Sequence, residues 1–224
     1  MHRSLPAVAV VLVMACNESS SGTSPIQAGP IDSAAVTPVV IVLGDSLTAG
    51  PGLNSAEAYP ALLQERARAA GYPHRIVNAG VSGDTTTDAV NRFERALVPE
   101  TRVLVVALGA NDGLRGHPVD TVKGNLRRII DRAKSRDIRV LLCGMDTPPS
   151  HGWDYSIAFH NIFPDLAREL DVPLMPFLLT GVVGDDRLNL PDRFHPNAAG
   201  MQVIASGMWP YLAPLLKATS SVAR

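Results

Sequence analysis

The chain has 224 residues, a formal net charge of −1 and 46% hydrophobic residues, which suffices for one domain with a sizeable core. Its charged residues are spread along the chain without basic blocks, so the charge pattern gives no reason to expect nucleic acid as a partner. Glycine and proline, at 18 residues each, suit a fold with many turns between strands and helices.

The first 15 residues have the pattern of a secretory signal peptide. A short basic start precedes an apolar run over residues 5–14, which is too short to span a bilayer. The run ends in Val13-Met14-Ala15-Cys16, which resembles the lipobox of bacterial lipoproteins, although Met14 departs from the usual small residue. We therefore expect an exported protein, either a cell-envelope lipoprotein that contacts the membrane through a lipidated Cys16 or a periplasmic protein.

The two cysteines favour lipidation over a disulfide. Cys143 lies in an apolar, strand-like run, whereas Cys16 is followed by small polar residues that are typical of a flexible tether. A disulfide between a tether and a buried strand would be unusual, so we expect Cys143 to be a small buried hydrophobe. The predicted organisation is a signal peptide over residues 1–15, a tether over 16–37 and one folded domain over 38–218.

From residue 38 onward, strand patterns alternate with helix patterns. Five apolar residues in a row over 39–43 cannot alternate between two faces, so this strand should be covered on both. The alternation predicts an α/β fold, a three-layer sandwich with a mostly five-stranded parallel sheet. The expected strands are 39–43, 75–78, 103–108, 140–143 and 172–177. The expected helices are 59–70, 86–97, 119–136, 155–170 and 197–217, the last kinked or broken at Pro210.

The first strand ends abruptly on Gly44-Asp45-Ser46, which places Ser46 just past the carboxyl end of the strand. Ligands bind at that edge in open α/β sheets, so Ser46 is a candidate nucleophile. The alternative is that Asp45 or Ser46 merely caps a following helix. The strand alone does not separate these two interpretations.

Polar groups also follow the later strands. A glycine-rich loop follows the second strand, Asn111 follows the third, and Asp192 stands three residues before His195 near the end of the chain. A serine hydroxyl needs a base within hydrogen-bond reach, and His195 can act as that base and then as an acid. Asp192 would hold the tautomer of His195. We therefore predict Ser46, His195 and Asp192 as catalytic residues.

These segments resemble the four sequence blocks of the SGNH hydrolases, also called GDSL esterases and lipases. The matching residues are Gly44–Leu47, Gly83, Gly109–Asp112 and Asp192–His195, and the resemblance extends over residues 39–216. The chain is most similar to the branch called arylesterase, acyl-CoA thioesterase I or lysophospholipase L1. The resemblance implies the flavodoxin-like SGNH hydrolase fold.

The resemblance also implies an oxyanion hole made by the N–H groups of Ser46 and Gly83 and the side-chain amide of Asn111. It implies neither a metal nor a cofactor. Residue 48 is threonine, so the serine is not in the G-x-S-x-G elbow of α/β-hydrolases. Residues 146–153 fit no shared pattern, and we expect a different substrate preference if they line the acyl site.

The expected function is that of a serine esterase that cleaves aryl or alkyl esters, thioesters or lysophospholipids through a Ser-His-Asp triad and an acyl-enzyme. Its expected partner is a small-molecule ester. One alternative is an O-deacetylase of cell-envelope polysaccharide, which uses the same fold and triad. Another is a non-catalytic, lipid-anchored binding protein, but binding alone would not require Ser46, Asn111, Asp192 and His195 together.

The remaining polar residues are expected to have structural places. Asp84 and Asp112 should fix loops, and Asp45 should brace the turn of the nucleophile. Four scattered histidines show no pair at metal-ligand spacing, so we expect them on the surface or in loops: His74, His117, His151 and His160.

Overall fold

The computed structural model describes residues 1–2 and 36–220. Nearly all of the predicted signal peptide and tether, with the lipidation site at Cys16, therefore lie outside the described residues. The first described element, β1, begins at Val39, one residue after the predicted start of the domain. Among the described helices, none combines the length and the hydropathy that a membrane crossing requires.

Five parallel strands form one sheet in the order β2-β1-β3-β4-β5. This is the flavodoxin-like order, in which the direction of strand addition reverses between β1 and β3 and leaves a crevice for ligands at the carboxyl ends. The predicted α/β fold with a five-stranded parallel sheet is confirmed. The strands are β1 (Val39–Gly44), β2 (Arg75–Gly80), β3 (Thr101–Ala107), β4 (Arg139–Cys143) and β5 (Leu174–Met175).

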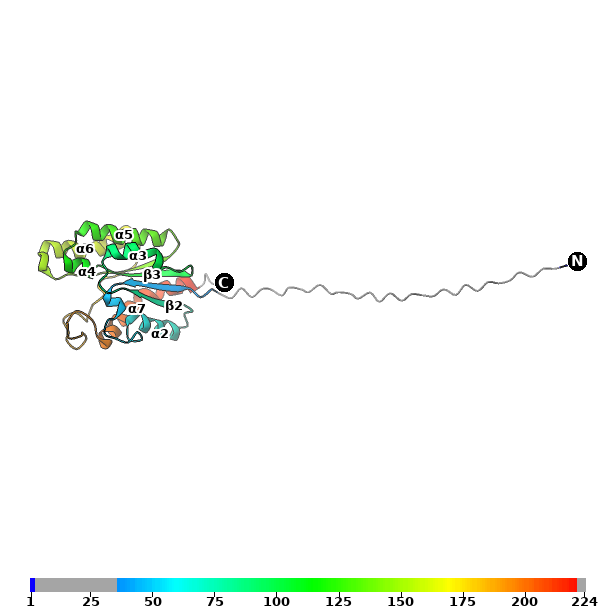
Figure 1. Ribbon diagram of the computed structural model, residues 1–224, viewed down its shortest axis with the longest axis horizontal. Coiled ribbons are helices and arrows are strands. Elements are labelled where there is room, and N and C mark those ends of the chain that lie inside the picture. Colours follow the sequence, from blue (N-terminus) through cyan, green and yellow to red (C-terminus); the bar gives the residue numbers. More distant parts are fainter. Residues whose placement is uncertain (3–35, 221–224) are drawn as a thin grey trace. The chain divides into compact units, whose positions relative to one another are not determined.

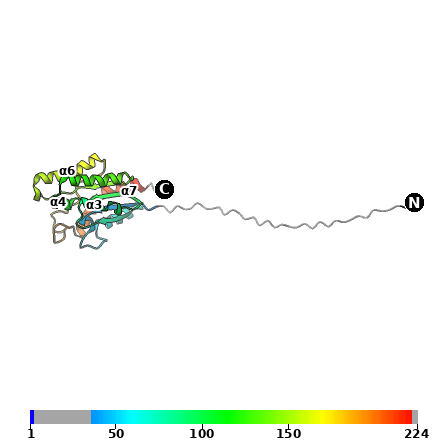
Figure 2. The same ribbon diagram turned by 45° about the horizontal axis from the view of Figure 1, so that its top comes forward.

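Helices cover both faces of this sheet and complete the three-layer sandwich (Figures 1 and 2). One face carries α2 (Tyr59–Ala69) and α7 (Ala198–Ser220), which pack against each other. The other carries α3 (Thr86–Ala96), α5 (Val119–Lys134) and α6 (Trp153–Glu169). Short pieces at the carboxyl edge are α1 (Ser46–Ala49), α4 (Ala110–Arg115) and the 3₁₀ turn η1 (Pro149–His151).

The register of the sheet brings three strand ends level with one another. Gly44 at the end of β1 pairs with Gly80 of β2 on one side and with Ala107 of β3 on the other. Every residue of β1 is buried, as the unbroken apolar run predicted. The loops that follow these strands therefore begin beside each other, and this arrangement assembles the site.

The fifth strand is shorter than predicted. It pairs with β4 only over Leu174 and Met175, whereas the expected strand covered residues 172–177. Pro173 and Pro176 flank the pair, and proline cannot donate a hydrogen bond to a ladder. Cys143, on the neighbouring β4, is fully buried as expected, and burial raises the pKa of its thiol to about 12.

Of the kink or break predicted at Pro210, the break does not occur. Helix α7 continues through Pro210 and through Pro214 to Ser220. Each proline removes one backbone hydrogen bond of the helix. The helix persists because one of its sides is buried against the sheet and α2, through residues that include Met208, Leu212 and Leu216.

Candidate active site

Ser46 is the first residue of α1, directly beyond the carboxyl end of β1. The side chain of Asp45 accepts a hydrogen bond from the Leu47 N–H at 2.9 Å and caps this one-turn helix. Gly50 ends the helix in the left-handed region, with φ +71°, and donates to the Ser46 carbonyl at 3.0 Å. Capping by Asp45 and presentation of Ser46 are thus compatible, because the cap is what holds Ser46 at the strand end.

Helix α1 is pressed against the end of β2. A Cβ atom on Gly80 would lie 2.4 Å from the Ala49 nitrogen and 2.9 Å from the Asp45 carbonyl oxygen, so only glycine permits this approach. The Thr48 hydroxyl also bonds to the Tyr59 hydroxyl at 2.7 Å, from α2 below. The backbone that carries Ser46 is therefore fixed from two sides.

His195 connects the serine to a carboxylate. Its Nε2 lies 2.9 Å from the Ser46 Oγ, and its Nδ1 lies 2.7 Å from Oδ2 of Asp192. The other Asp192 oxygen accepts from the backbone N–H groups of Phe194 and His195 at 2.9 and 3.0 Å. The His195 backbone N–H is the largest cause that lowers the pKa of Asp192 to about 2, followed by the imidazole and the Phe194 N–H. The carboxylate is therefore charged at neutral pH.

The turn that carries His195 is closed by its own backbone. The Leu190 N–H donates to the His195 carbonyl at 2.7 Å, and Asn189 forms an isolated antiparallel bridge with Pro196. Arg193 adopts a left-handed φ of +62°, which bends the chain between the aspartate and the histidine. This closed turn lets Asp192 and His195 share one loop and still face each other.

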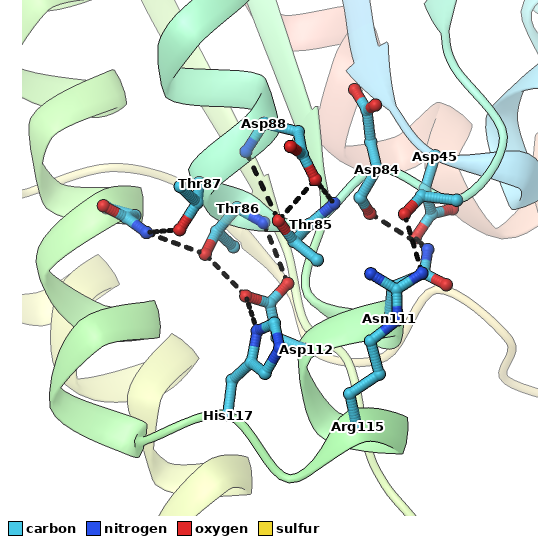
Figure 3. A network of polar contacts seen from close by, with 12 residues as sticks. Asp45, Asp84, Thr85, Thr86, Thr87, Asp88, Asn111, Asp112, Arg115 and His117 are labelled. Atoms are coloured by element: carbon cyan, nitrogen blue, oxygen red, sulfur yellow. Dashed lines mark hydrogen bonds and ion pairs between the residues drawn. The ribbon is translucent and has the colours of Figure 1, made fainter.

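Asn111 lies one residue into α4, beyond the end of β3. Its amide nitrogen donates to the Asp84 carbonyl at 2.9 Å and lies 3.4 Å from Oδ2 of Asp45 (Figure 3). Gly109, the residue before α4, has φ +120°, and its Cα faces the rings of Phe159 and Phe163 on α6. Asn111 is therefore held between the turn that carries Ser46 and the loop after β2.

A second buried carboxylate braces the same loops. Asp112 accepts from the N–H and the hydroxyl of Thr86, both at 2.8 Å, which ties the start of α3 to α4 (Figure 3). Asp45 is also fully buried, and desolvation is the main cause that raises its pKa to about 6. The expected structural places of Asp45 and Asp112 agree with these contacts.

A cavity of about 720 Å³ opens beside the serine. Ser46, Asn111, Asp192 and His195 line it, and most of its exposed surface is apolar. Gly83 is absent from this lining, although Asp84 next to it accepts the Asn111 amide. The apolar part of the wall comprises Leu47, Ala110, Leu114, Pro148, Phe177, Leu179, Val183 and Phe194.

Comparisons with known proteins agree with this geometry. Residues 42–203 match the model of the GDSL-like Lipase/Acylhydrolase family. The chain belongs to this family. It is 37% identical to the "Esterase TesA" of Pseudomonas aeruginosa over 183 residues, which cover 81% of this chain and 91% of that protein.

Other members of the GDSL-like family are similar over comparable lengths. The "Thioesterase 1/protease 1/lysophospholipase L1" of Escherichia coli strain K12 is 36% identical over 184 residues, 82% of this chain and 87% of that protein. The crystal structure of the psychrotrophic esterase EstA from Pseudoalteromonas sp. matches with a TM-score of 0.76 and 30% identity. That match covers 80% of this chain and 98% of the other. The resemblance to SGNH hydrolases is thereby confirmed.

The segment that fits no shared pattern of the GDSL-like family contributes to the cavity. Asp146, Thr147 and Pro148 line it, and Asp146 bonds to Nδ1 of His160 at 2.7 Å. Trp153, at the end of the segment, is 71% exposed and is not a lining residue. The first half of the segment therefore forms part of the cavity wall.

His74 lies in the loop just before β2, as the prediction of a surface or loop position allows, but it is buried. Its Nε2 bonds to the Thr219 hydroxyl of α7 at 2.8 Å. The final turn of α7 covers this loop. Across residues 36–220, no three His, Cys, Asp or Glu side chains gather in a way that could hold a metal ion.

Sequence patterns did not identify the exposed apolar residues that wall the cavity. Leu114, Val183 and Phe194 are large, apolar and 45%, 61% and 63% exposed, and they lie on three separate segments. No periodicity links them, because Leu114 lies in the six-residue helix α4 and the other two lie outside helices and strands. The unusual exposure of large apolar side chains around one opening is visible only in three dimensions.

Proposed function

We propose that this GDSL-like hydrolase is a serine esterase. Ser46 is the nucleophile, His195 is the general base, and the Asp192 carboxylate orients the His195 imidazole. The supporting observation is the unbroken relay from the Ser46 Oγ through the imidazole to the carboxylate, at 2.9 and 2.7 Å. These are the separations that proton transfer requires. The relay stands at the mouth of an apolar cavity, where an acyl group can bind.

The reaction proceeds in two halves. The Ser46 Oγ attacks the carbonyl carbon while Nε2 of His195 takes the hydroxyl proton, and Asp192 stabilises the resulting imidazolium. The tetrahedral intermediate collapses, His195 gives the proton to the leaving alcohol, phenol or thiol, and an acyl-Ser46 ester remains. Water then attacks this ester with His195 again as the base, which releases the acid and restores the serine.

The negative oxygen of each intermediate needs fixed donors. The Ser46 N–H, the Gly83 N–H and the Asn111 amide are the donors in this proposal, because they come from three loops that meet at one sheet edge. Gly83 itself is not among the residues that line the cavity, but the residue after it, Asp84, accepts the Asn111 amide through its carbonyl. Donors of this kind often supply the largest single part of the catalysis.

The substrate class follows from the wall of the cavity. Most of its exposed surface comes from aliphatic and aromatic side chains, which favours an apolar acyl or aryl group over a sugar. The names of the relatives, an esterase, a thioesterase and an arylesterase, support the same range of esters and thioesters. The expected substrates are therefore small carboxylic esters and thioesters with an apolar acyl part.

Replacement of the nucleophile tests the proposal directly. Ser46→Ala removes the attacking oxygen, so we expect kcat for a p-nitrophenyl ester to fall at least about 10⁴-fold. A serine-reactive fluorophosphonate should label the wild type at Ser46 alone, as read by peptide mass spectrometry. Ser55→Ala, at an exposed serine away from the cavity, is the matched control and should keep full activity. Undiminished turnover by Ser46→Ala would show that another residue is the nucleophile.

The place of the protein in the cell is a separate proposal. The signal-like start and the lipobox-like Val13-Met14-Ala15-Cys16 support export and attachment to the envelope through Cys16. Mass spectrometry of the mature N-terminus should then find diacylglycerol on Cys16. An unmodified N-terminus at another residue would leave export standing and remove the anchor.

A further inference from the structure

Arg92 lies on α3 and reaches the carboxyl edge of the sheet, although the mechanism above gives it no part. Its Nε donates to Oδ2 of Asp84 at 2.5 Å, and its Nη2 donates to the Gly44 carbonyl at 2.9 Å. The two charged side chains are only 16% and 11% exposed. Charges so far from water persist where they are paired and hydrogen-bonded, so this contact is a built feature of the fold.

Both ends of this contact lie next to proposed oxyanion donors. Asp84 directly follows Gly83, and its own carbonyl accepts the Asn111 amide at 2.9 Å. Gly44 lies two residues before Ser46, and its carbonyl also accepts the Val81 N–H at 3.0 Å from the loop after β2. The Arg92 guanidinium therefore connects two segments. One is the loop that contains Gly83 and binds the Asn111 amide through the Asp84 carbonyl, and the other is the turn that contains Ser46.

Arg92 and Asp84 themselves have no access to the substrate. Neither residue lines the cavity that contains Ser46, Asn111 and His195. Any effect of Arg92 on turnover must therefore pass through the backbone and side chains that it holds.

We propose that Arg92, paired with Asp84, is a positioning residue that keeps the three oxyanion donors at their mutual spacing. This inference rests on the proposed esterase function. The planar guanidinium suits the task because it presents several donors in a fixed fork and can bind two acceptors at once. A lysine ammonium is a point charge that can pair with Asp84 but does not reproduce the fork toward the Gly44 carbonyl.

The size of the effect follows from how sharply catalysis depends on donor position. A displacement of about 1 Å from productive geometry can cost about 10²-fold in rate. Loss of Arg92 frees the loop from the turn without removing any donor. We therefore expect kcat to fall about 10- to 100-fold, with KM within about threefold of the wild type, because the apolar wall that binds the acyl group is untouched.

The experiment compares five variants by kcat, KM and the fraction of active sites. Arg92→Gln removes the charge, and Arg92→Lys keeps the pairing charge but not the fork. Arg95→Gln is the matched control, an exposed arginine on the same helix. Asn111→Ala and the double variant Arg92→Gln/Asn111→Ala complete a double-mutant cycle with Arg92→Gln and the wild type. Titration with the fluorophosphonate counts the reactive serines, so each kcat refers to folded, competent enzyme.

A positioning role predicts a particular pattern. Arg92→Gln should lower kcat per site, Arg92→Lys should be intermediate, and Arg95→Gln should equal the wild type. The fold-decrease in kcat that Asn111→Ala causes should be at least fivefold smaller in the Arg92→Gln background than in the wild type. An amide that is already displaced contributes less to catalysis, so its removal has a smaller effect. The pH at which kcat/KM rises should stay constant, since Arg92 does not contact His195.

Other results overturn the inference. If the Arg92→Gln and Asn111→Ala effects multiply, or if kcat per titrated site is unchanged, Arg92 serves stability alone. If Arg92→Gln does not fold, the double variant Asp84→Asn/Arg92→Gln leaves no unpaired buried charge and is measured in the same way. Activity that survives Ser46→Ala contradicts the proposed function itself, whereas an inactive Ser46→Ala beside a fully active Arg92→Gln contradicts this inference alone.

Discussion

The two N–H groups of the Asn111 amide have different partners. One donates to the Asp84 carbonyl at 2.9 Å, and the contact with Asp45 at 3.4 Å is too long to be strong. The second N–H is therefore the one that we expect to turn toward the substrate oxygen as it becomes negative. Asn111 thus combines a structural bond with a proposed catalytic one.

Removal of the Asn111 amide should destabilise the transition state more than the bound substrate. We expect Asn111→Ala to lower kcat by ~10²–10³-fold with little change in KM, the range for one lost oxyanion donor. Steady-state kinetics with a p-nitrophenyl ester measure both constants. A raised KM with unchanged kcat would instead mean that Asn111 binds the ground state of the substrate.

Asp45 makes the stability of the fold depend on pH. In the unfolded chain it ionises near its ordinary pKa of 3.8, whereas burial in the folded protein raises the pKa to about 6. The folded state therefore holds the proton more tightly, and this residue makes folding less favourable as pH rises from about 4 to about 6. The upper limit of this cost is roughly 3 kcal/mol, at about 1.4 kcal/mol for each pKa unit.

Asp45→Asn should remove this cost, because an amide does not titrate. The free energy of unfolding of the variant relative to the wild type should rise between pH 4 and pH 6 and then level off. Urea unfolding at several pH values measures this difference, and the other titrating groups cancel in the comparison. A difference that is constant across the range would show that the pKa of Asp45 is the same in the folded and unfolded states.

At the scale of elements, the site depends on close contact between β2 and α1. Gly80 leaves no room for a Cβ atom beneath α1, whereas Gly124, inside α5, has open space around it. This contrast provides a matched pair of glycine substitutions. One should displace the nucleophile turn, and the other should affect only the helix in which it lies.

We expect Gly80→Ala to destabilise the protein by about 1–3 kcal/mol and to lower kcat, because α1 must move with Ser46. Gly124→Ala should be neutral or stabilise by up to about 1 kcal/mol, since alanine is the better helix former. Urea unfolding and fluorophosphonate labelling rates measure the two effects. Equal behaviour of the two variants would mean that α1 does not depend on Gly80.

At the scale of the whole molecule, the proposed anchor and the proposed site lie in different parts of the sequence. All residues of the site lie between Val39 and Asn197, whereas Cys16 lies outside the described residues. Cys16→Ser should move the protein from the membrane fraction to the soluble fraction and leave kcat unchanged, because a lipoprotein is held by its acyl chains. Cys143→Ala is the control and should stay with the membrane. If Cys16→Ser also stays there, another contact provides the attachment.

Much of the architecture could be predicted from local patterns. The apolar runs at 39–43, 103–108 and 140–143 identified the central strands, because a strand buried on both faces has no polar positions. Ser46 and the pair Asp192 and His195 were visible as candidates, since each stands at a strand end or shares one short turn. The boundaries of the edge elements were less accurate, because proline and end effects decide them.

Contacts between distant parts of the chain decided the rest. Arg92 donates a hydrogen bond to the Gly44 carbonyl, 48 residues away in the sequence. His74 and the Thr219 hydroxyl of α7 are hydrogen-bonded and stand 145 residues apart. Helix α7 runs through Pro210 because its packing holds it, and the cavity wall gathers from loops without any common period. Residue types and spacing describe what each segment prefers alone. The free energy that buries an arginine, a histidine or a cavity wall arises when separate segments pack, so these features are settled in the folded chain.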